Sequence, residues 1–285
     1  MTKENILTGN DIPVLIGAAQ LMEDVFKSGL YRELKTATNK LETIKETIRH
    51  QIESGDTRRY ELPNNVIAKF VPFPIYNTDE VGLKEYLYDL GILPHTTTLT
   101  KKSFKEEPNL LDELIPYQYP TEYFAQFYLN KLGKLHIDKE DYSYSNDLHE
   151  LSLHFLEQST ILDNRKRLYE NIMLKIKNCP FLLQSKVLKS SYGTCKLREK
   201  ETRYDTHSIC LEYGVDFLMN YGQVSFQSVE NFSTMGYFNL SEIRQFRKLI
   251  DIQLRFVVMD KEKDIKQSEY FQHQLMRKAQ LLRYA

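Results

Sequence analysis

A regular apolar stripe between residues 30 and 52 constrains the fold of this chain more than any other feature of its sequence. Apolar side chains recur there at alternating steps of three and four residues, which places them on one face of an α-helix. They are Leu30, Leu34, Ala37, Leu41, Ile44, Ile48 and Ile52. Charged residues fill the opposite face, so the sequence predicts a long amphipathic helix whose stripe needs a partner. The partner is either a preceding helix, predicted from a cap at Asp11 to about Lys27, or a second copy of the chain.

A small antiparallel sheet is expected after this helix. Residues 59–62 and 66–71 are predicted to form two strands joined by a turn over 63–65, because proline presets φ and asparagine accepts positive φ at little cost. Pro72 and Pro74 have no N–H group to donate, so the sheet pairing is expected to end there.

The N-terminal module continues with a helix predicted over 79–90, with Gly91 as its stop, and a third strand near 95–100. With the charged coil before them, the segments YELPNNVIAKFVP and GLKEYLYDLGILP make residues 30–94 similar to small coil-plus-hairpin accessory proteins encoded by bacteriophages. The resemblance implies a protein of a phage or mobile element that inhibits or assists a host protein complex. It assigns a role to no individual residue.

Three prolines between residues 106 and 120 interrupt regular structure and predict a linker. The predicted fold class is mainly α with a small antiparallel β-sheet, an α+β arrangement. A helix–hairpin–helix module over 1–105 precedes a mostly helical domain over 121–285. Helices of that domain are expected over 121–132, 147–158, 161–177, 209–221, 239–257 and 265–283, with a short strand over 192–200.

The composition is that of a soluble globular protein, since 41% of the 285 residues are hydrophobic and 27% are charged. The N-terminal apolar run 12–19 contains Pro13 and is too short to span a bilayer. Three cysteines form no disulfide framework. These features predict a cytoplasmic protein with free thiols and no membrane partner.

The near-zero net charge of −1 hides two regions of opposite sign. Residues 161–203 carry eleven basic and four acidic side chains, whereas 138–157 carry six acidic and one basic. The basic region is a candidate for binding phosphate backbones. Its candidate residues are Arg165, Lys166, Arg167, Lys196, Arg198 and Arg203. The alternative is that these cations pair with acidic surface of the same chain or of another subunit.

Aromatic residues suggest a protein interface, because the chain has 19 Tyr and Tyr combines apolar area with a hydrogen-bonding hydroxyl. The alternative is that they pack inside the second domain. The candidate interface residues are Tyr117, Tyr119, Tyr123 and Tyr128, together with Leu34, Leu41, Ile44 and Ile48 of the helical stripe.

No Gly-rich phosphate loop or nucleophile elbow occurs in the sequence. A zinc site built from Cys179, Cys195, His207 and Cys210 would lack the closely spaced ligand pairs of structural zinc sites, so no metal, cofactor or catalytic residue is predicted. The leading hypothesis is a non-catalytic, homo-oligomeric protein that binds another protein or protein complex. Nucleic-acid binding through 161–203 is the alternative, and an enzyme with a site assembled from distant residues is the third hypothesis.

Overall fold

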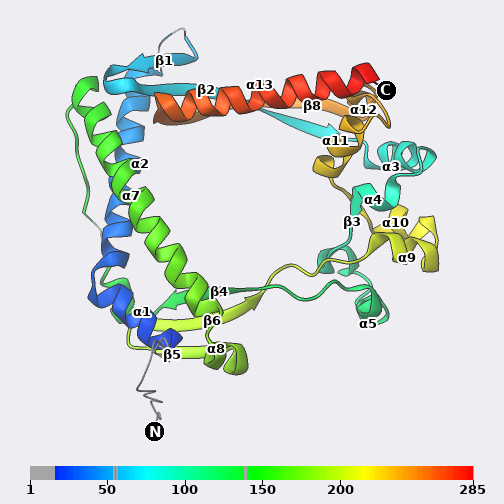
Figure 1. Cartoon of the computed structure of the whole chain (residues 1–285), viewed down its shortest axis with the longest axis horizontal. Helices are drawn as coiled ribbons and strands as arrows, with labels where there is room; N and C mark the ends of the chain where they lie inside the picture. The colour runs from blue at the N-terminus through cyan, green and yellow to red at the C-terminus, as the bar shows by residue number, and fades with distance from the viewer. Residues whose placement is uncertain (1–16, 54, 56, 138–139, 285) are drawn as a thin grey trace. The chain divides into compact units, whose positions relative to one another are not determined.

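The computed structural model describes residues 17–53, 55, 57–137 and 140–284 (Figure 1). Contacts divide the chain into two compact units, each built from two separate segments: 1–54 with 123–199, and 55–122 with 200–285. The prediction of a mainly helical fold with small antiparallel sheets is confirmed, with 58% helix and 21% strand. The boundaries between the units lie after residues 54, 122 and 199, and the predicted linker 106–120 lies within the second unit.

The first unit is a helical layer on a three-stranded sheet of order β4-β6-β5, with all strands antiparallel. Its elements are α1 (Ala18–Lys27), α2 (Leu30–Ile52), β4 (Tyr123–Leu129), α6 (Lys131–Lys134), α7 (Leu148–Lys177), α8 (Pro180–Ser185), β5 (Val187–Ser190) and β6 (Gly193–Glu199).

The predicted stripe helix is confirmed as α2, and its main partner is α7. The two helices run antiparallel, because Glu33 near the start of α2 pairs with Arg165 at 2.7 Å while Gln51 at its end donates to the carbonyl of Asn146 at 2.6 Å. Leu41, Ile44 and Ile48 are buried, and so are Leu151 and Phe155 of α7. The stripe therefore closes inside the chain. The predicted helix cap at Asp11 lies outside the described residues.

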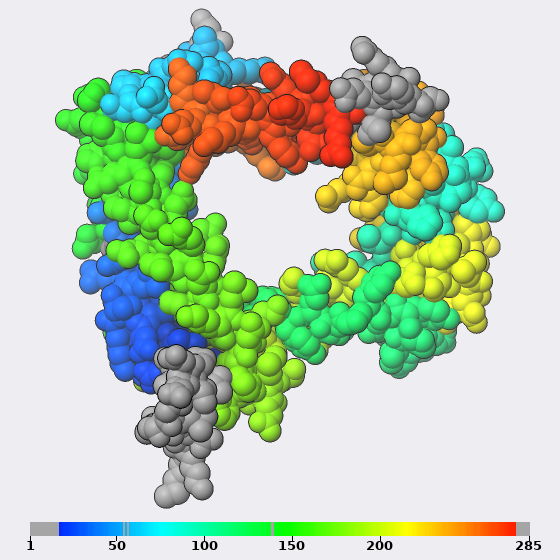
Figure 2. Space-filling view, viewed as in Figure 1, coloured from blue at the N-terminus to red at the C-terminus, as the bar shows by residue number. Residues whose placement is uncertain are grey.

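Helix α7 is one continuous helix, although the sequence predicts two over 147–158 and 161–177. Asp147 caps its start through the N–H of His149, as expected for a short acidic side chain. The hydroxyl of Thr160 donates to the carbonyl of Leu156, which satisfies this side chain without breaking the helix. Figure 2 shows the side chains of α7 on the surface of the first unit.

The predicted helix over 121–132 is wrong, because residues 123–129 form strand β4. The aromatic residues of this segment fit a helical spacing, but they also alternate between the two faces of a strand. Pairing with β6 selects the strand. The predicted strand over 192–200 is confirmed as β6.

The second unit contains a long ribbon of two strands and a set of short helices. Its strands are β1 (Arg59–Leu62), β2 (Val66–Thr78), β3 (Thr97–Thr98), β7 (Gln223–Val224) and β8 (Arg247–Asp260). Its α-helices are α3 (Glu80–Asp89), α4 (Leu93–Thr96), α5 (Leu110–Glu113), α9 (Thr206–Tyr213), α10 (Val215–Tyr221), α11 (Phe226–Thr234), α12 (Leu240–Ile243) and α13 (Lys261–Tyr284). Short 3-10 turns are η1 (Pro63–Asn65), η2 (Lys101–Phe104), η3 (Ile115–Tyr117) and η4 (Arg244–Phe246).

The predicted hairpin of β1 and β2 is confirmed, but β2 does not end at the two prolines. It continues to Thr78 and pairs with β8 along its whole length. Phe70 donates its N–H to the carbonyl of Arg58, on the β1 side of β2. Every second residue of a strand directs its N–H group to the same edge, so Pro72 and Pro74 lack N–H groups on the same edge as Phe70. At these two positions β1 has already ended. Prolines are tolerated at such an edge because no hydrogen bond is lost.

The predicted helix over 239–257 is also wrong beyond its first turn. The expected capping box of Asn239 and Glu242 is present, but helix α12 ends at Ile243 and strand β8 begins at Arg247. The third strand of the hairpin sheet is β8, whereas the strand expected near 95–100 is limited to β3 and pairs with β7. Helix α11 was not predicted, and Gly214 at φ +82° divides the helix predicted over 209–221 into α9 and α10.

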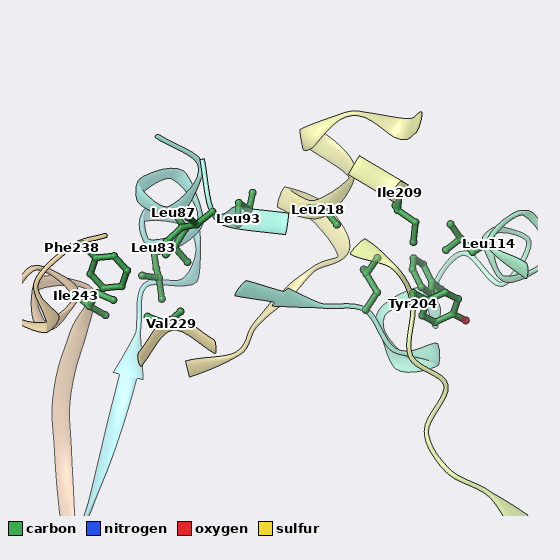
Figure 3. Close-up of a cluster of buried hydrophobic side chains, with 13 residues drawn as sticks. Leu83, Leu87, Leu93, Leu114, Tyr204, Ile209, Leu218, Val229, Phe238 and Ile243 are labelled. Atoms are coloured by element: carbon green, nitrogen blue, oxygen red, sulfur yellow. The ribbon is translucent and has the colours of Figure 1, made fainter. Parts of the chain in front are cut away.

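The short helices of the second unit share one apolar core (Figure 3). Leu83 and Leu87 of α3, Leu218 of α10 and Val229 of α11 are almost completely buried in it. Leu114 is fully buried in the same core. The segment 106–120 is thus a folded part of this unit. None of the helices in the described residues is long and apolar enough to cross a membrane.

Candidate nucleic-acid interface

The sheet β4-β6-β5 has one face covered by helices and one face open to solvent. Because paired residues of antiparallel strands point to the same side, the register assigns every side chain to one of the two faces. On the covered face, Phe127, Cys195 and Leu197 pack with Phe26 of α1 and Ile176 of α7. This packing fixes the sheet and leaves its opposite side free.

The open side, here called the front face, carries eight side chains. They are Phe124, Gln126, Tyr128, Val187, Lys189, Thr194, Lys196 and Arg198. All are exposed or half-buried, and none is acidic. The three strands carry Lys189, Lys196 and Arg198, and their one acidic residue, Glu199, pairs with Tyr123 and so belongs to the covered side. The front face is therefore a positively charged surface with two aromatic rings.

Tyr128 is the centre of the front face. Arg198 donates to its hydroxyl oxygen from Nε at 3.0 Å and from Nη2 at 2.8 Å. The hydroxyl in turn donates to Oε1 of Gln126 at 2.6 Å. The Nζ of Lys196 lies 5.2 Å and the Cζ of Arg198 5.5 Å from the ring centroid, within the range of cation–π attraction. These contacts hold the ring and two cations in a fixed arrangement.

Phe124 provides a second ring on the same face. It lies directly opposite Arg198 in the register and is 41% exposed. Phe124 and Tyr128 are four residues apart on one strand, which separates them by about 13 Å along β4. Two aromatic rings with cations between them can stack bases and pair with the phosphates that join those bases.

The front face depends on a tight hairpin between β5 and β6. At Gly193 an added Cβ would lie 2.1 Å from the carbonyl oxygen of Tyr128, so the close approach of β4 requires glycine. The turn before it is held by Glu23 of α1, which accepts from the backbone N–H of Ser191 at 3.1 Å and from its hydroxyl at 2.7 Å. Helix α1 thus fixes the position of the hairpin.

Replacing Glu23 by glutamine is expected to destabilise the first unit by about 1 kcal/mol at neutral pH. The hydrogen bonds from Ser191, followed by the contact with Lys27, lower the pKa of Glu23. A lowered pKa stabilises the fold above the ordinary carboxyl pKa, and this contribution is lost as the pH falls through the lowered value. Urea unfolding followed by circular dichroism should show a difference at pH 7 that vanishes in acid. The exposed Glu46→Gln change of α2 is the control, and an equal loss there would contradict this role.

The structure brings together only part of the residues selected from the sequence. Tyr128, Lys196 and Arg198 meet on the front face, whereas Tyr123 lies on the covered face with the Nζ of Lys186 4.3 Å from its ring centroid. On α7, Arg165 is already paired with Glu33, Lys166 lies 4.0 Å from Glu170, and Arg167 is exposed. The cations of α7 are thus partly neutralised.

The remaining candidates lie elsewhere. Tyr117, Tyr119 and Arg203 belong to the second unit, where the N–H of Tyr119 donates to the carbonyl of Arg203 at 2.9 Å. Tyr117 packs on the core of that unit, and Tyr119 is 53% exposed. Leu34 of α2 is half-buried, while Leu41, Ile44 and Ile48 are covered. The covered residues are therefore unavailable as an interface in the folded chain.

Phe124 and Gln126 of the front face are not among the candidates that the sequence indicates. Residues 124, 126 and 128 lie on one face if the segment is a strand, and this spacing could have indicated them. Interpreting the segment as a helix hides it. A second signal is the excess of basic over acidic residues in the segments of the three strands, which the charge totals of longer regions conceal.

Metal chemistry gains no support from the described part of the chain, where no three His, Cys, Asp or Glu side chains gather in a metal-binding arrangement. Cys179 and Cys195 lie in the first unit, and His207 and Cys210 in the second. Burial raises the pKa of Cys195 to about 12, which keeps its thiol protonated.

No protein-family model, no curated protein and no solved structure matched this chain.

Proposed function

We propose that this protein binds single-stranded nucleic acid through the front face of the sheet β4-β6-β5. The observation that carries the proposal is the ring of Tyr128 held beside Lys196 and Arg198, with Phe124 exposed on the same side. An acid-free sheet face attracts the phosphate backbone, and exposed rings accept unpaired bases. Bases inside a duplex cannot stack on such rings, so single strands are favoured over duplexes.

Binding of a fluorescein-labelled single-stranded oligonucleotide, followed by fluorescence anisotropy, tests this proposal. Lys189, Lys196 and Arg198 are expected to neutralise three phosphates of the bound strand. The logarithm of affinity should therefore fall against the logarithm of salt concentration with a slope of about −2. Affinity for a duplex of the same sequence should be weaker. No anisotropy change with single strands at low salt would reject the proposal.

Changing Lys196 and Arg198 together to glutamate is expected to weaken binding by about tenfold or more, because two phosphate contacts become repulsive. Tyr128→Ala should cost about tenfold through lost base stacking. The matched control is the double change of Lys166 and Arg167 to glutamate, which alters the net charge equally on the exposed side of α7. An equal loss in the control would move the binding surface from the sheet to α7.

A protein-binding role is the second candidate function, and one observation favours it. Several large apolar side chains of β2 and β8 are exposed, including Leu249, Ile252 and Leu254, and contiguous apolar surface of this kind marks interaction sites. A pull-down with the full chain should recover a partner that is lost when Leu254 is changed to glutamate. Recovery that does not depend on these residues would argue against this surface.

A further inference from the structure

The ribbon of β2 and β8 in the second unit has two different faces. Paired residues on one face are Phe70 with Phe256, Pro72 with Leu254, Pro74 with Ile252, and Tyr76 with Leu249. These eight residues are here called the apolar strip. Beyond the ring contact of Phe70 with Phe256, at 5.0 Å between centroids, the strip is exposed: Tyr76 by 39%, Leu249 by 47%, and Ile252 and Leu254 by 50% each.

The opposite face of the ribbon carries the charged residues Lys248, Asp251 and Arg255 and is here called the polar face. It also carries Val71 and Phe73, which are 38% and 41% exposed, and the start of helix α13 lies on it. Lys69 of this face pairs with Asp264 of α13, and so does Arg59 of β1, which is opposite Lys69 in the register. The start of α13 therefore packs on the polar face (Figure 1). The apolar strip lies on the other side of the ribbon from this contact.

The prolines limit how another chain can meet the ribbon. Pro72 and Pro74 occupy the free edge of β2 and cannot donate hydrogen bonds to an added strand. Their rings also belong to the apolar strip. A partner is thus directed to the face of the ribbon near β2 and away from this edge.

We propose that the occupant of the apolar strip is the same strip of a second copy, packed face to face about a two-fold axis. The strip itself has no charged side chain, and Arg247 lies at its end, with Cζ 4.1 Å from the ring centroid of Tyr76. Two copies therefore meet without repulsion between like charges along the part from Phe70 to Ile252. A two-fold arrangement places identical patches against each other, as an isologous interface requires. Sheets that pack face to face on apolar residues are a common arrangement.

The exposed area is sufficient for a reversible dimer. Tyr76, Leu249, Ile252 and Leu254 leave roughly 400 Å² exposed per copy, to which the exposed Pro72 and Pro74 add. Two copies together therefore bury an area near the lower limit of about 1,000 Å² for specific interfaces. A dimer of this size is expected to dissociate on dilution. This inference is independent of nucleic-acid binding, which uses a different surface in the first unit.

Size-exclusion chromatography with light scattering on the full chain tests the dimer. The unmodified chain should give twice the monomer mass at high concentration and approach the monomer mass on dilution. Leu254→Glu should weaken dimerisation by about tenfold or more, because a charge would be buried in the interface. The matched control is Val71→Glu, which introduces the same charge on the polar face opposite Arg255.

A second measurement separates loss of the interface from loss of folding. Leu254→Glu and Leu254→Lys chains should each be monomeric with an unchanged far-ultraviolet circular dichroism spectrum, and an equimolar mixture should recover dimer through opposite charges. A monomeric unmodified chain at all concentrations overturns the proposal. A dimer that Val71→Glu weakens as much as Leu254→Glu also overturns it. A dimer that Leu254→Glu leaves intact does so too, and is the result expected if the two copies pair through the free edge of β8. Nucleic-acid affinity of the monomeric variants reports on the proposed function separately.

Discussion

Substituting aspartate for Ile48 is expected to unfold the first unit, with a loss of more than about 4 kcal/mol of stability. Ile48 is fully buried on the stripe of α2 that packs on α7. Its replacement removes apolar contacts and places a carboxylate where no solvent reaches it. The milder Ile48→Ala change should cost about 3 kcal/mol through the cavity it leaves.

Circular dichroism suits this test because the chain has no tryptophan to report on unfolding by fluorescence. The Ile48→Asp chain should lose helical signal at temperatures where the unmodified chain is folded. The control Glu46→Asp introduces the same residue type at an exposed position of α2 and should have little effect. If the stripe served a second copy, Ile48→Asp would instead give a folded monomer, and that result would contradict closure on α7.

Replacing Asp264 by asparagine is expected to release the start of α13 from β1 and β2, at a cost of about 2–3 kcal/mol. Asp264 is only 4% exposed, and its carboxylate accepts from Lys69 and from Nη2 of Arg59, the latter at 3.0 Å. Asparagine is uncharged and leaves two neighbouring cations without their counter-charge. Hydrogen exchange should show reduced protection of α13, while the core containing Leu83 and Leu218 keeps its protection.

The same contact predicts a dependence on pH. Lys69, and after it Arg59, lowers the pKa of Asp264, while burial acts in the opposite direction. The contribution of Asp264 is therefore complete above the ordinary aspartate pKa of about 4 and is lost as the pH falls through the lowered value. The stability difference between the unmodified chain and Asp264→Asn should shrink in acid. Asp89→Asn, at an exposed position of α3, controls for removal of one negative charge. A pH-independent difference would exclude this ionic role.

The candidate interface shows why site prediction succeeded only in part. The sequence indicates Tyr128 as a candidate for a protein interface, and Lys196 and Arg198 as candidates for phosphate binding because they belong to the basic region 161–203. Their meeting point could not be predicted, because β4 and β6 are separated by the whole of α7 in the sequence. The same basic region also includes the cations of α7, where Arg165 has an acidic partner on α2.

The sequence by itself determined the local structure wherever the spacing of apolar residues and the capping or turn residues at the ends of a segment indicated the same element. The stripe of α2, the turn at Pro63–Asn65 and the capping box at Asn239 all follow from contacts within a few residues. Tertiary structure decided β4 and β8, whose apolar residues fit a helix and a strand equally well. A strand gains its hydrogen bonds from a distant partner, and the pairing of β2 with β8 joins residues far apart in the chain. The pairing of β2 with β8 placed the two prolines at a free edge and the apolar strip on one face of the ribbon. The pairing of β4, β6 and β5 placed three cations beside Phe124 and Tyr128 on one face of the other sheet.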